Sequence, residues 1–342
     1  MLRNINNNLP VYRARTHLLP RTITEAWDHN TNTTINYLLQ TTLTPHQQRQ
    51  TQLPLQLGGL GMLELTYRSA AAYLGSWQSY ATKSPHTYTD TTFQHHYPQA
   101  NTQVQEAYRR MQHLLPPDHP KPTWTHWTTH SHDLSQNTLT KLVNNKLYDQ
   151  LHAATTTLHR TILDNMNGPA NGSWIYPNPQ STQNLTDLHY TTALKLRLGI
   201  AVHTHDHTCK HNNNGTQCSQ PLDTHAHHSL TCATGPHRTQ RHDNIKITLN
   251  KWIKTHGYHT QLERHTPDLD SHHDDGSHTK AIMDIVATQD TQVHYIDVTV
   301  TSPLTTETVT HDQPPSTKNP TQRREQDKRR KYHNHCNLQP FV

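Results

Sequence analysis

Three of the four cysteines in this 342-residue chain fall close together, between positions 209 and 232. With one histidine they form the pattern Cys-x8-Cys-x9-His-x3-Cys, whose members are Cys209, Cys218, His228 and Cys232. Tetrahedral zinc takes four thiolate or imidazole ligands, and a His-x3-Cys pair brings two of them together over about one helical turn. The spacing therefore predicts a structural zinc site, with three nearby histidines as rival ligands: His211, His225 and His227.

The composition supports a zinc site but makes single histidines uninformative. Only 31% of the residues are hydrophobic, and two are Phe. Metal binding supplies folding free energy that a chain with so few core residues cannot obtain from hydrophobic burial. The chain also holds 33 His among many Thr, Asn and Gln, residues that are encoded mainly by codons rich in A and C. A skewed coding strand explains this excess, so a metal site needs cysteines to be credible.

The charge and hydropathy exclude some classes of protein. Charged residues make up 16% of the chain and the formal net charge is +5, which is compatible with nucleic-acid binding without being diagnostic. No apolar run approaches the roughly 18 residues that a membrane span needs. Residues 1–8 lack the apolar stretch of a signal peptide. We expect an intracellular protein that is not secreted, whose cysteines are ligands or free thiols.

The first third of the chain contains helical pieces around one glycine-rich segment. Residues 53–62 read Leu-Pro-Leu-Gln-Leu-Gly-Gly-Leu-Gly-Met, and glycine tolerates positive φ at little cost, so we expect a turn there. Residues 69–77 begin Ser-Ala-Ala-Ala, which suits a helix packed closely against a neighbour.

The middle of the chain has a different character. Residues 81–133 are interrupted by prolines and are predicted to be a linker or a loose helical spacer. Apolar residues then recur at helical spacing from Leu139 to Ile162, with Ser135 available as the N-cap. This pattern predicts one long amphipathic helix, ended by Gly168 and Pro169.

Two β-rich runs near the C-terminus bring two aspartates together. Residues 281–287 and 293–300 flank a short polar stretch, which predicts a hairpin with its turn centred near 290–291. Asp284 then lies opposite Asp297, and opposed residues have Cβ atoms about 4.5–5.5 Å apart. The other face carries the core residues, Met283 and Ile285 against Ile296, Val298 and Val300.

Two carboxylates at that distance repel unless a cation lies between them. Mg²⁺ is commonly held by one or two carboxylates and a substrate phosphate, and it can activate water for phosphodiester cleavage. Glu263, before the hairpin, can supply a third carboxylate. The simpler alternative is that Asp297 sits on an exposed face and Asp284 merely ends a strand.

Taken in order, these motifs resemble the C-terminal region of non-LTR retrotransposon polyproteins that carry a restriction-like endonuclease. The resemblance rests on seven further segments, which are Leu53–Trp77, Arg197–Ile200, Leu222–Asp223, Arg241–Asp243, Gln261–Glu263, Asp297–Pro303 and Lys328–Tyr332. The segment at Arg241 opens a helix whose expected apolar face is Ile245, Leu249, Trp252 and Ile253.

The resemblance implies an α+β protein with a helical N-terminal half, then a zinc segment and a PD-(D/E)XK-like mixed sheet flanked by helices. Residues 1–80 resemble a reverse-transcriptase thumb remnant, and 81–194 a helical linker region. Residues 195–240 correspond to the CCHC zinc-binding segment. Residues 241–342 correspond to the endonuclease domain, which the chain leaves truncated at its C-terminus.

The resemblance also assigns roles to individual residues. Asp284 and Asp297 become the Mg²⁺ ligands and Glu263 an accessory acid. Lys328 or Lys331 orients water or neutralises phosphate, with Tyr332 beside them. Four arginines of the same basic segment contact the nucleic-acid backbone, namely Arg323, Arg324, Arg329 and Arg330.

The chain departs from the family pattern at several points. Ile282 and Met283 replace the proline expected before the first aspartate, and Thr299 stands where the simplest motif has lysine. The first cysteine pair is widened, and the chain stops at residues 338–342, inside the expected next strand. No Tyr-x-Asp-Asp motif occurs, so this chain has no polymerase palm.

Three hypotheses follow for function. The first is a nuclear, element-derived endonuclease that nicks target DNA for integration, with DNA and element RNA as partners and no membrane. The second is a catalytically inactive nucleic-acid-binding fragment. The third is a structural helical protein with a chance metal site.

Overall fold

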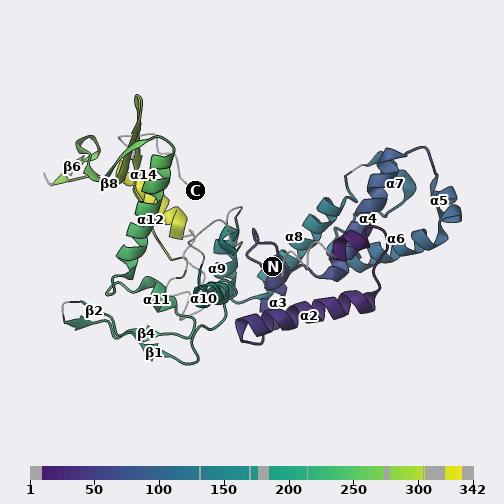
Figure 1. The fold of residues 1–342 in the computed structure, drawn as a ribbon, viewed down its shortest axis with the longest axis horizontal. Helices are drawn as coiled ribbons and strands as arrows, with labels where there is room; N and C mark the ends of the chain where they lie inside the picture. The colour runs from purple at the N-terminus through teal and green to yellow at the C-terminus, as the bar shows by residue number, and fades with distance from the viewer. Residues whose placement is uncertain are drawn as a thin grey trace. The chain divides into compact units, whose positions relative to one another are not determined.

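The computed structural model describes residues 10–130, 132–168, 171–175, 185–213, 215–272, 278–302, 304 and 320–332. The chain divides into two compact units, Met1–Ile200 and Ala201–Val342. Helices build the first unit and short strands with helices build the second, so the α+β class is confirmed (Figure 1). No helix in the described ranges is long and apolar enough to span a membrane.

The first unit consists of helices packed around one central member, α4 (Leu65–Lys83), which contacts α2, α6, α7 and α8. The small residues at its start are buried, as expected, and an added Cβ at Gly75 would lie 2.5 Å from the Gln136 backbone nitrogen. The other helices are α2 (Arg21–Leu39), α3 (Pro45–Gln52), α5 (Asp90–His96), α6 (Pro98–Met111), α7 (Trp124–Thr129), α8 (Gln136–Ala154), α9 (Thr157–Met166) and α10 (Asp187–Arg197), with 3-10 turns η1 (Gln112–Leu114) and η2 (Ser173–Ile175).

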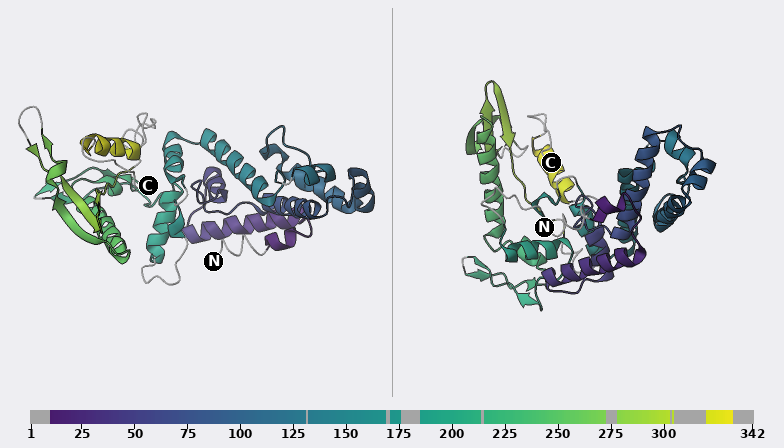
Figure 2. Two further views of the ribbon diagram at one scale, coloured as in Figure 1. Left: turned by 90° about the horizontal axis from the view of Figure 1, so that it is seen from above. Right: turned by 45° about the vertical axis from the view of Figure 1, so that its right-hand side comes forward.

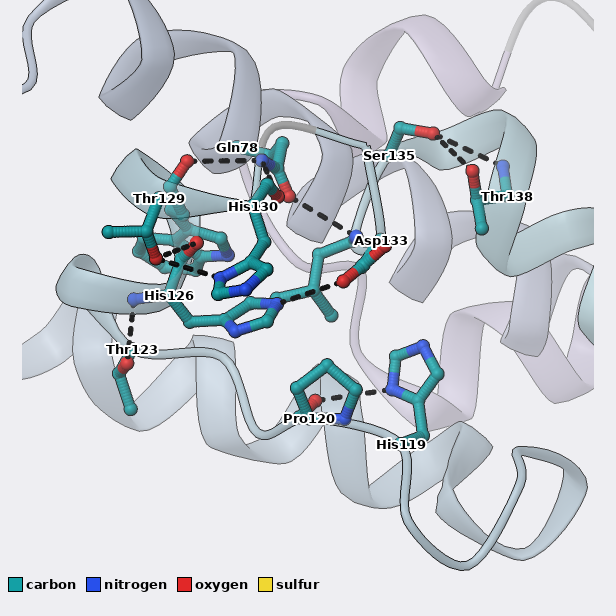
Figure 3. Close-up of polar contacts among 12 residues, drawn as sticks. Gln78, His119, Pro120, Thr123, His126, Thr129, His130, Asp133, Ser135 and Thr138 are labelled. Carbon is teal, nitrogen blue, oxygen red and sulfur yellow. Dashed lines mark hydrogen bonds and ion pairs between the residues drawn. The ribbon is translucent and has the colours of Figure 1, made fainter.

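We expected residues 81–133 to be a loose spacer, but they are part of this packed unit. Phe93, Trp124 and Trp127 are buried in the same apolar cluster as residues of α4. Gln78 of α4 adds a buried polar tie (Figure 3): its Nε2 donates to the carbonyls of Trp127 and His130 at 3.2 and 3.0 Å. The proline-containing segment is therefore folded, because its aromatic side chains are buried in the core.

The predicted long helix over 139–162 is instead two helices. Helix α8 ends at Ala154, and α9 restarts at Thr157 with Thr156 as its N-cap, accepting the N–H of His159 at 3.3 Å. The periodicity missed this break because the β-branched threonines there favour a cap over a helix interior. The predicted N-cap of α8 is confirmed, since Ser135 Oγ accepts the N–H of Thr138 at 3.2 Å.

The glycine-rich segment forms the predicted turn, and a buried arginine holds it. Gly58 and Gly61 have φ of +82° and +72°, the left-handed region that glycine adopts at little cost. Arg197 of α10 donates to the carbonyls of Leu55 and Gly59 at 2.6 and 3.1 Å, and to Asn171 at 3.1 Å. Hydrogen bonding compensates the burial of this charge.

The described residues of the second unit form four small antiparallel sheets. Strand β1 (His207–Thr208) pairs with β4 (Pro221–Leu222), β2 (Asn212–Asn213) with β3 (Thr216–Gln217), and β6 (Ser271–His272) with β7 (His278–Thr279). The largest sheet has the order β5-β8-β9, from β5 (His259–His265), β8 (Ile282–Gln289) and β9 (Gln292–Ile296). The remaining elements are α11 (His227–Thr231), α12 (His237–Thr255), η3 (Pro267–Leu269) and α14 (Pro320–Tyr332).

The register of the β8–β9 hairpin confirms the predicted turn. Gln289 pairs with Gln292 and Ile285 with Ile296, and Asp290 in the turn has φ of 52°. The strand β9 stops at Ile296, however, so Val298 is half-buried and Val300 is 39% exposed, which corrects the prediction that both lie in the core. The described strands pair only in antiparallel fashion, and the expected strand at 338–342 lies outside the described residues.

Helix α12 lies along the sheet and contacts β5 and β8 (Figure 2). Its buried face matches the predicted one only in part, since Leu249 and Ile253 pack against the sheet. Ile253 is buried, but so are the polar Lys246 and Asn250, whereas Ile245 and Trp252 are 47% and 53% exposed. The hydrophobic pattern was wrong at Ile245 and Trp252 because the buried side of the helix also carries polar residues, Lys246 and Asn250, that bond to Glu263 and Thr260 of β5.

Candidate functional site

The four residues predicted to bind metal do come together. Ligand atoms of Cys209, Cys218, His228 and Cys232 all lie within 4.8 Å of one another. The Sγ atom of Cys232 is 3.8 Å from Sγ of both other cysteines, and Cys218 Sγ is 3.3 Å from His228 Nε2. Three sulfurs and one imidazole nitrogen in this arrangement can hold a metal ion.

Two short hairpins bring the first cysteine pair together despite its wide spacing. The N–H of Cys209 donates to Gln220 at 2.9 Å, and the N–H of Ser219 donates back to Cys209 at 3.2 Å. The N–H of Cys218 donates to the His211 carbonyl at 2.8 Å. The residues between the cysteines therefore form the β2–β3 hairpin, which extends outwards without separating the sulfurs.

A capped helix presents the other two ligands. Asp223 accepts the backbone N–H groups of His225, His227 and His228 at the start of α11, which carries His228 and ends just before Cys232. Burial raises the pKa of the Asp223 carboxyl, but the charge of His227 and these hydrogen bonds outweigh it and lower the pKa. The cap sets the helix so that His228 and Cys232 face the hairpin.

The structure also separates the rival histidines from the ligand set. His227 Nδ1 lies 3.1 Å from Asp223, and its ring stacks with that of His225. His211 Nδ1 lies 3.3 Å from Cys232 Sγ but does not belong to the mutually close group. His228 is therefore the histidine that completes the four-ligand cluster.

The backbone around the cysteines influences their pKa values in different directions. The backbone N–H of Gln220 lowers the pKa of the Cys218 thiol. At Cys209 the backbone N–H of His211 acts in the same direction, but burial and the neighbouring cysteines outweigh it and raise the pKa. Gathered thiols oppose one another's ionisation, and a bound cation removes that opposition.

The three predicted acids form a row at one end of the largest sheet, on β5, on β8 and directly after β9. Leu262 pairs with Ile285 and Arg264 with Met283, so Glu263 stands across from Asp284. Asp284 and Asp297 are the next residues beyond the last β8–β9 pair. Within the described part of the chain, their carboxylates do not join into a second group of three mutually close metal ligands.

Each acid of the row has a basic or hydroxyl partner from a helix. Lys246 of α12 donates to Glu263 Oε1 at 2.5 Å, and His242 Nε2, four residues before it, lies 3.2 Å from Asp284 Oδ2. From α14, Lys328 and the Tyr332 hydroxyl donate to Asp297 Oδ2 at 2.5 and 2.9 Å.

Asp284 and Lys246 make further contacts beside the three acids. The backbone N–H of Val298 donates to Asp284 Oδ2 at 2.7 Å, which folds the chain after β9 back onto β8. Asp243 lies 3.0 Å from Lys246 Nζ. The hydrogen bonds that Lys246 donates to Glu263 and Asp243 raise the pKa of Lys246. Burial lowers the pKa of His242, but Asp243 and the charge of Asp284 outweigh it and raise the pKa.

The structure distinguishes between the two lysines predicted to serve the site. Lys328 contacts Asp297, whereas Lys331 is exposed and its Nζ lies 5.0 Å from the centre of the Tyr332 ring. The four arginines lie on the same helix, where Arg324, Arg329 and Arg330 pair with acids of α14 itself. Arg323 is exposed and makes no ion pair within the described residues.

Sequence reasoning missed the roles of His242 and Lys246. Their spacing of four residues places both on one face of α12, which was a usable signal once that helix was predicted. No model of a known protein family, no curated protein and no solved structure matches the chain.

Proposed function

We propose that the second unit is a retrotransposon-derived, Mg²⁺-dependent DNA endonuclease that nicks target DNA for integration in the nucleus. The observation that carries the proposal is the row of Glu263 on β5, Asp284 on β8 and Asp297 directly after β9, with Lys328 beside the last of them. Carboxylates and a basic group at one end of a sheet are what metal-assisted phosphodiester cleavage needs.

The residues present fit a divalent cation. Asp284 and Asp297 offer hard oxygen ligands at neighbouring positions, and a Mg²⁺ ion held there would supply charge neutralisation at the phosphate. The chain's own groups then have separate tasks. Lys246 and His242 orient two of the acids, and Lys328 places a positive charge where phosphate oxygens arrive.

The Cys3His cluster fits structural zinc within this proposal. Three thiolates and one imidazole form a closed set with no position left for substrate, which is typical of structural sites. Zinc binding would fix the β2–β3 hairpin and α11, two small elements with few apolar residues. DNA is the expected partner of the basic α14 helix, with element RNA as a second ligand.

One observation favours a second candidate, an inactive nucleic-acid-binding fragment. Each acid of the row already has a basic partner, namely Lys246, His242 or Lys328, and Thr299 occupies the position of the simplest motif's lysine. Such a row can hold the sheet and its helices together without a metal. The basic helix α14 would still bind phosphates.

Binding and cleavage measured on one plasmid separate the two candidates. The full-length zinc-loaded protein is incubated with supercoiled DNA in Mg²⁺ and, in parallel, in EDTA. The endonuclease proposal expects nicked circles in Mg²⁺ alone, with salt-sensitive binding in both. Salt-sensitive binding without nicking in Mg²⁺ would support the inactive fragment. The absence of both binding and nicking would refute both candidates.

A further inference from the structure

His211 lies beside the Cys3His cluster without belonging to it. Its Nδ1 atom is 3.3 Å from Sγ of Cys232, a cysteine that is almost fully buried. The four-ligand set is already complete with His228. A ring nitrogen at hydrogen-bonding distance from a ligand sulfur, but outside the ligand set, is placed to donate a hydrogen bond to that sulfur.

Several contacts determine where the His211 ring lies. The His211 carbonyl accepts the N–H of Cys218, so its backbone is fixed by the same hairpin that carries two ligands. The His237 ring lies 5.0 Å away, centre to centre. On another side the ring rests directly on Gly235, where an added Cβ would collide with its Nδ1, Cε1 and Cγ atoms.

The three atoms nearest to an added Cβ at Gly235 all belong to the imidazole of His211. Gly235 has no positive φ, so its backbone conformation does not require glycine. The missing side chain therefore provides space, and the group that occupies the space is His211.

We propose that His211 donates an N–H···S hydrogen bond to the Cys232 thiolate, and that Gly235 leaves room for it. The inference rests on the zinc centre proposed above. Zinc with three thiolates and a neutral imidazole has about one net negative charge. A donor at one sulfur offsets part of that charge and orients the ligand. The hydrogen bond therefore slows the loss of zinc and the alkylation of Cys232.

The test uses the full-length chain loaded with zinc, and separately with Co²⁺ as a spectroscopic probe. Zinc transfer to a chromogenic chelator gives the release rate, and the thiolate-to-cobalt absorption band reports on the sulfurs. The variants are His211→Ala, Gly235→Ala and the double variant. His225→Ala is the matched control, since His225 contacts no ligand atom among its described interactions.

We expect His211→Ala to bind one zinc but release it about 10- to 100-fold faster, with a shifted cobalt band. Gly235→Ala should act similarly by displacing the ring. In the double variant the glycine change should add nothing, because the ring it displaces is gone. His211→Gln, which keeps a side-chain N–H, should recover part of the retention.

Three outcomes would overturn the proposal. Release at the wild-type rate from His211→Ala would show that the contact does not stabilise the centre. Complete loss of zinc from His211→Ala, with the protein still folded, would make His211 a ligand. If the effects of the two substitutions on the zinc release rate multiply in the double variant, Gly235 does not act through His211. Wild-type protein that binds no zinc would instead refute the zinc centre itself.

Discussion

The Nζ atom of Lys246 on α12 lies 2.5 Å from the Oε1 atom of Glu263 on β5. Lys246 is almost fully buried, with 7% of its side chain exposed, whereas Glu263 is 67% exposed. Glu263 also has φ of 51°, a left-handed conformation that costs a non-glycine residue about 1–3 kcal/mol. The ion pair therefore joins α12 to a residue of β5 whose backbone conformation is unfavourable.

Replacing Lys246 with Met should therefore lower the nicking rate more than it lowers the free energy of unfolding. Glu263 and Asp243 stay partly solvated after the change, so the loss of folding stability should be within about 1 kcal/mol. Without Lys246, the Glu263 side chain should no longer be held in position. Plasmid nicking should then fall roughly tenfold, which corresponds to an activation free energy higher by about 1.4 kcal/mol. Thermal unfolding and nicking rates check the two statements.

The matched control is Lys251→Met, an exposed position of the same helix. It should leave both measurements near the wild-type values. Equal nicking by the Lys246 and Lys251 variants would contradict the positioning role.

A second prediction concerns acid stability at Asp270. Its carboxylate accepts the N–H of Ala281 at 2.6 Å and lies 3.0 Å from Nε2 of both His265 and His278. The Ala281 hydrogen bond, despite opposition from burial, and then the two histidines lower the pKa of this carboxyl. A lowered folded-state pKa gives stability that is complete above the unfolded value, about 3.9, and is lost as the pH falls through the folded value.

Asp270→Asn should accordingly be less stable than the wild type at pH 7, and the difference should narrow below about pH 4. Denaturant unfolding across that range measures it. A difference that stays constant from pH 7 to the acid limit would show that the carboxylate charge makes no contribution.

A third prediction addresses Arg197, which is buried in the first unit. Its replacement by Met leaves the carbonyls of Leu55, Gly59 and Asn171 without this donor. Unmet buried acceptors cost about 1–3 kcal/mol each, less where water enters, so we expect a loss of roughly 3 kcal/mol. Arg109→Met, at a side chain that is 74% exposed, should change the stability by less than about 0.5 kcal/mol. Similar stabilities of the two variants would refute the buried clamp.

A fourth prediction concerns the basic helix α14. Arg323 and Arg324 are exposed near its start, and the one ion pair of Arg324 among the described residues is a long contact of 3.9 Å to Asp327. If both contact DNA phosphates, Ala at both positions should lower the slope of log K against log salt concentration by about 2. Replacing Arg13 and Arg15 of the first unit, which are also exposed, should leave the slope unchanged. An unaltered slope in the α14 variant would remove these arginines from the interface.

The sequence was informative where geometry follows from spacing. The turn at 290–291 fixed the register of Asp284 and Asp297, because side chains alternate strictly along a strand. The four metal-binding candidates were likewise found from their types and intervals. In both cases a local rule determines which atoms meet.

The sequence was less informative where the partners come from distant segments. The burial of Lys246 depends on Glu263, and the burial of Arg197 depends on carbonyls more than 100 residues away. Hydrophobic patterns cannot reveal such polar burial, which is why the predicted face of α12 was right at Leu249 and Ile253 but wrong at Ile245 and Trp252. The folded state of residues 81–133 was missed for a related reason, since a few aromatic residues replace the usual periodic apolar face.

The measurement that tests the central proposal most directly is Mg²⁺-dependent nicking of supercoiled plasmid by full-length Asp284→Asn and Asp297→Asn proteins. Asp290→Asn, in the exposed turn of the same hairpin, is the matched control, and zinc content and unfolding temperature confirm that each variant is folded. The proposal predicts nicking by the wild type and the control, and a loss of at least about 100-fold in both other variants. Wild-type nicking that survives in either variant would contradict the assignment of these carboxylates as the cleavage site.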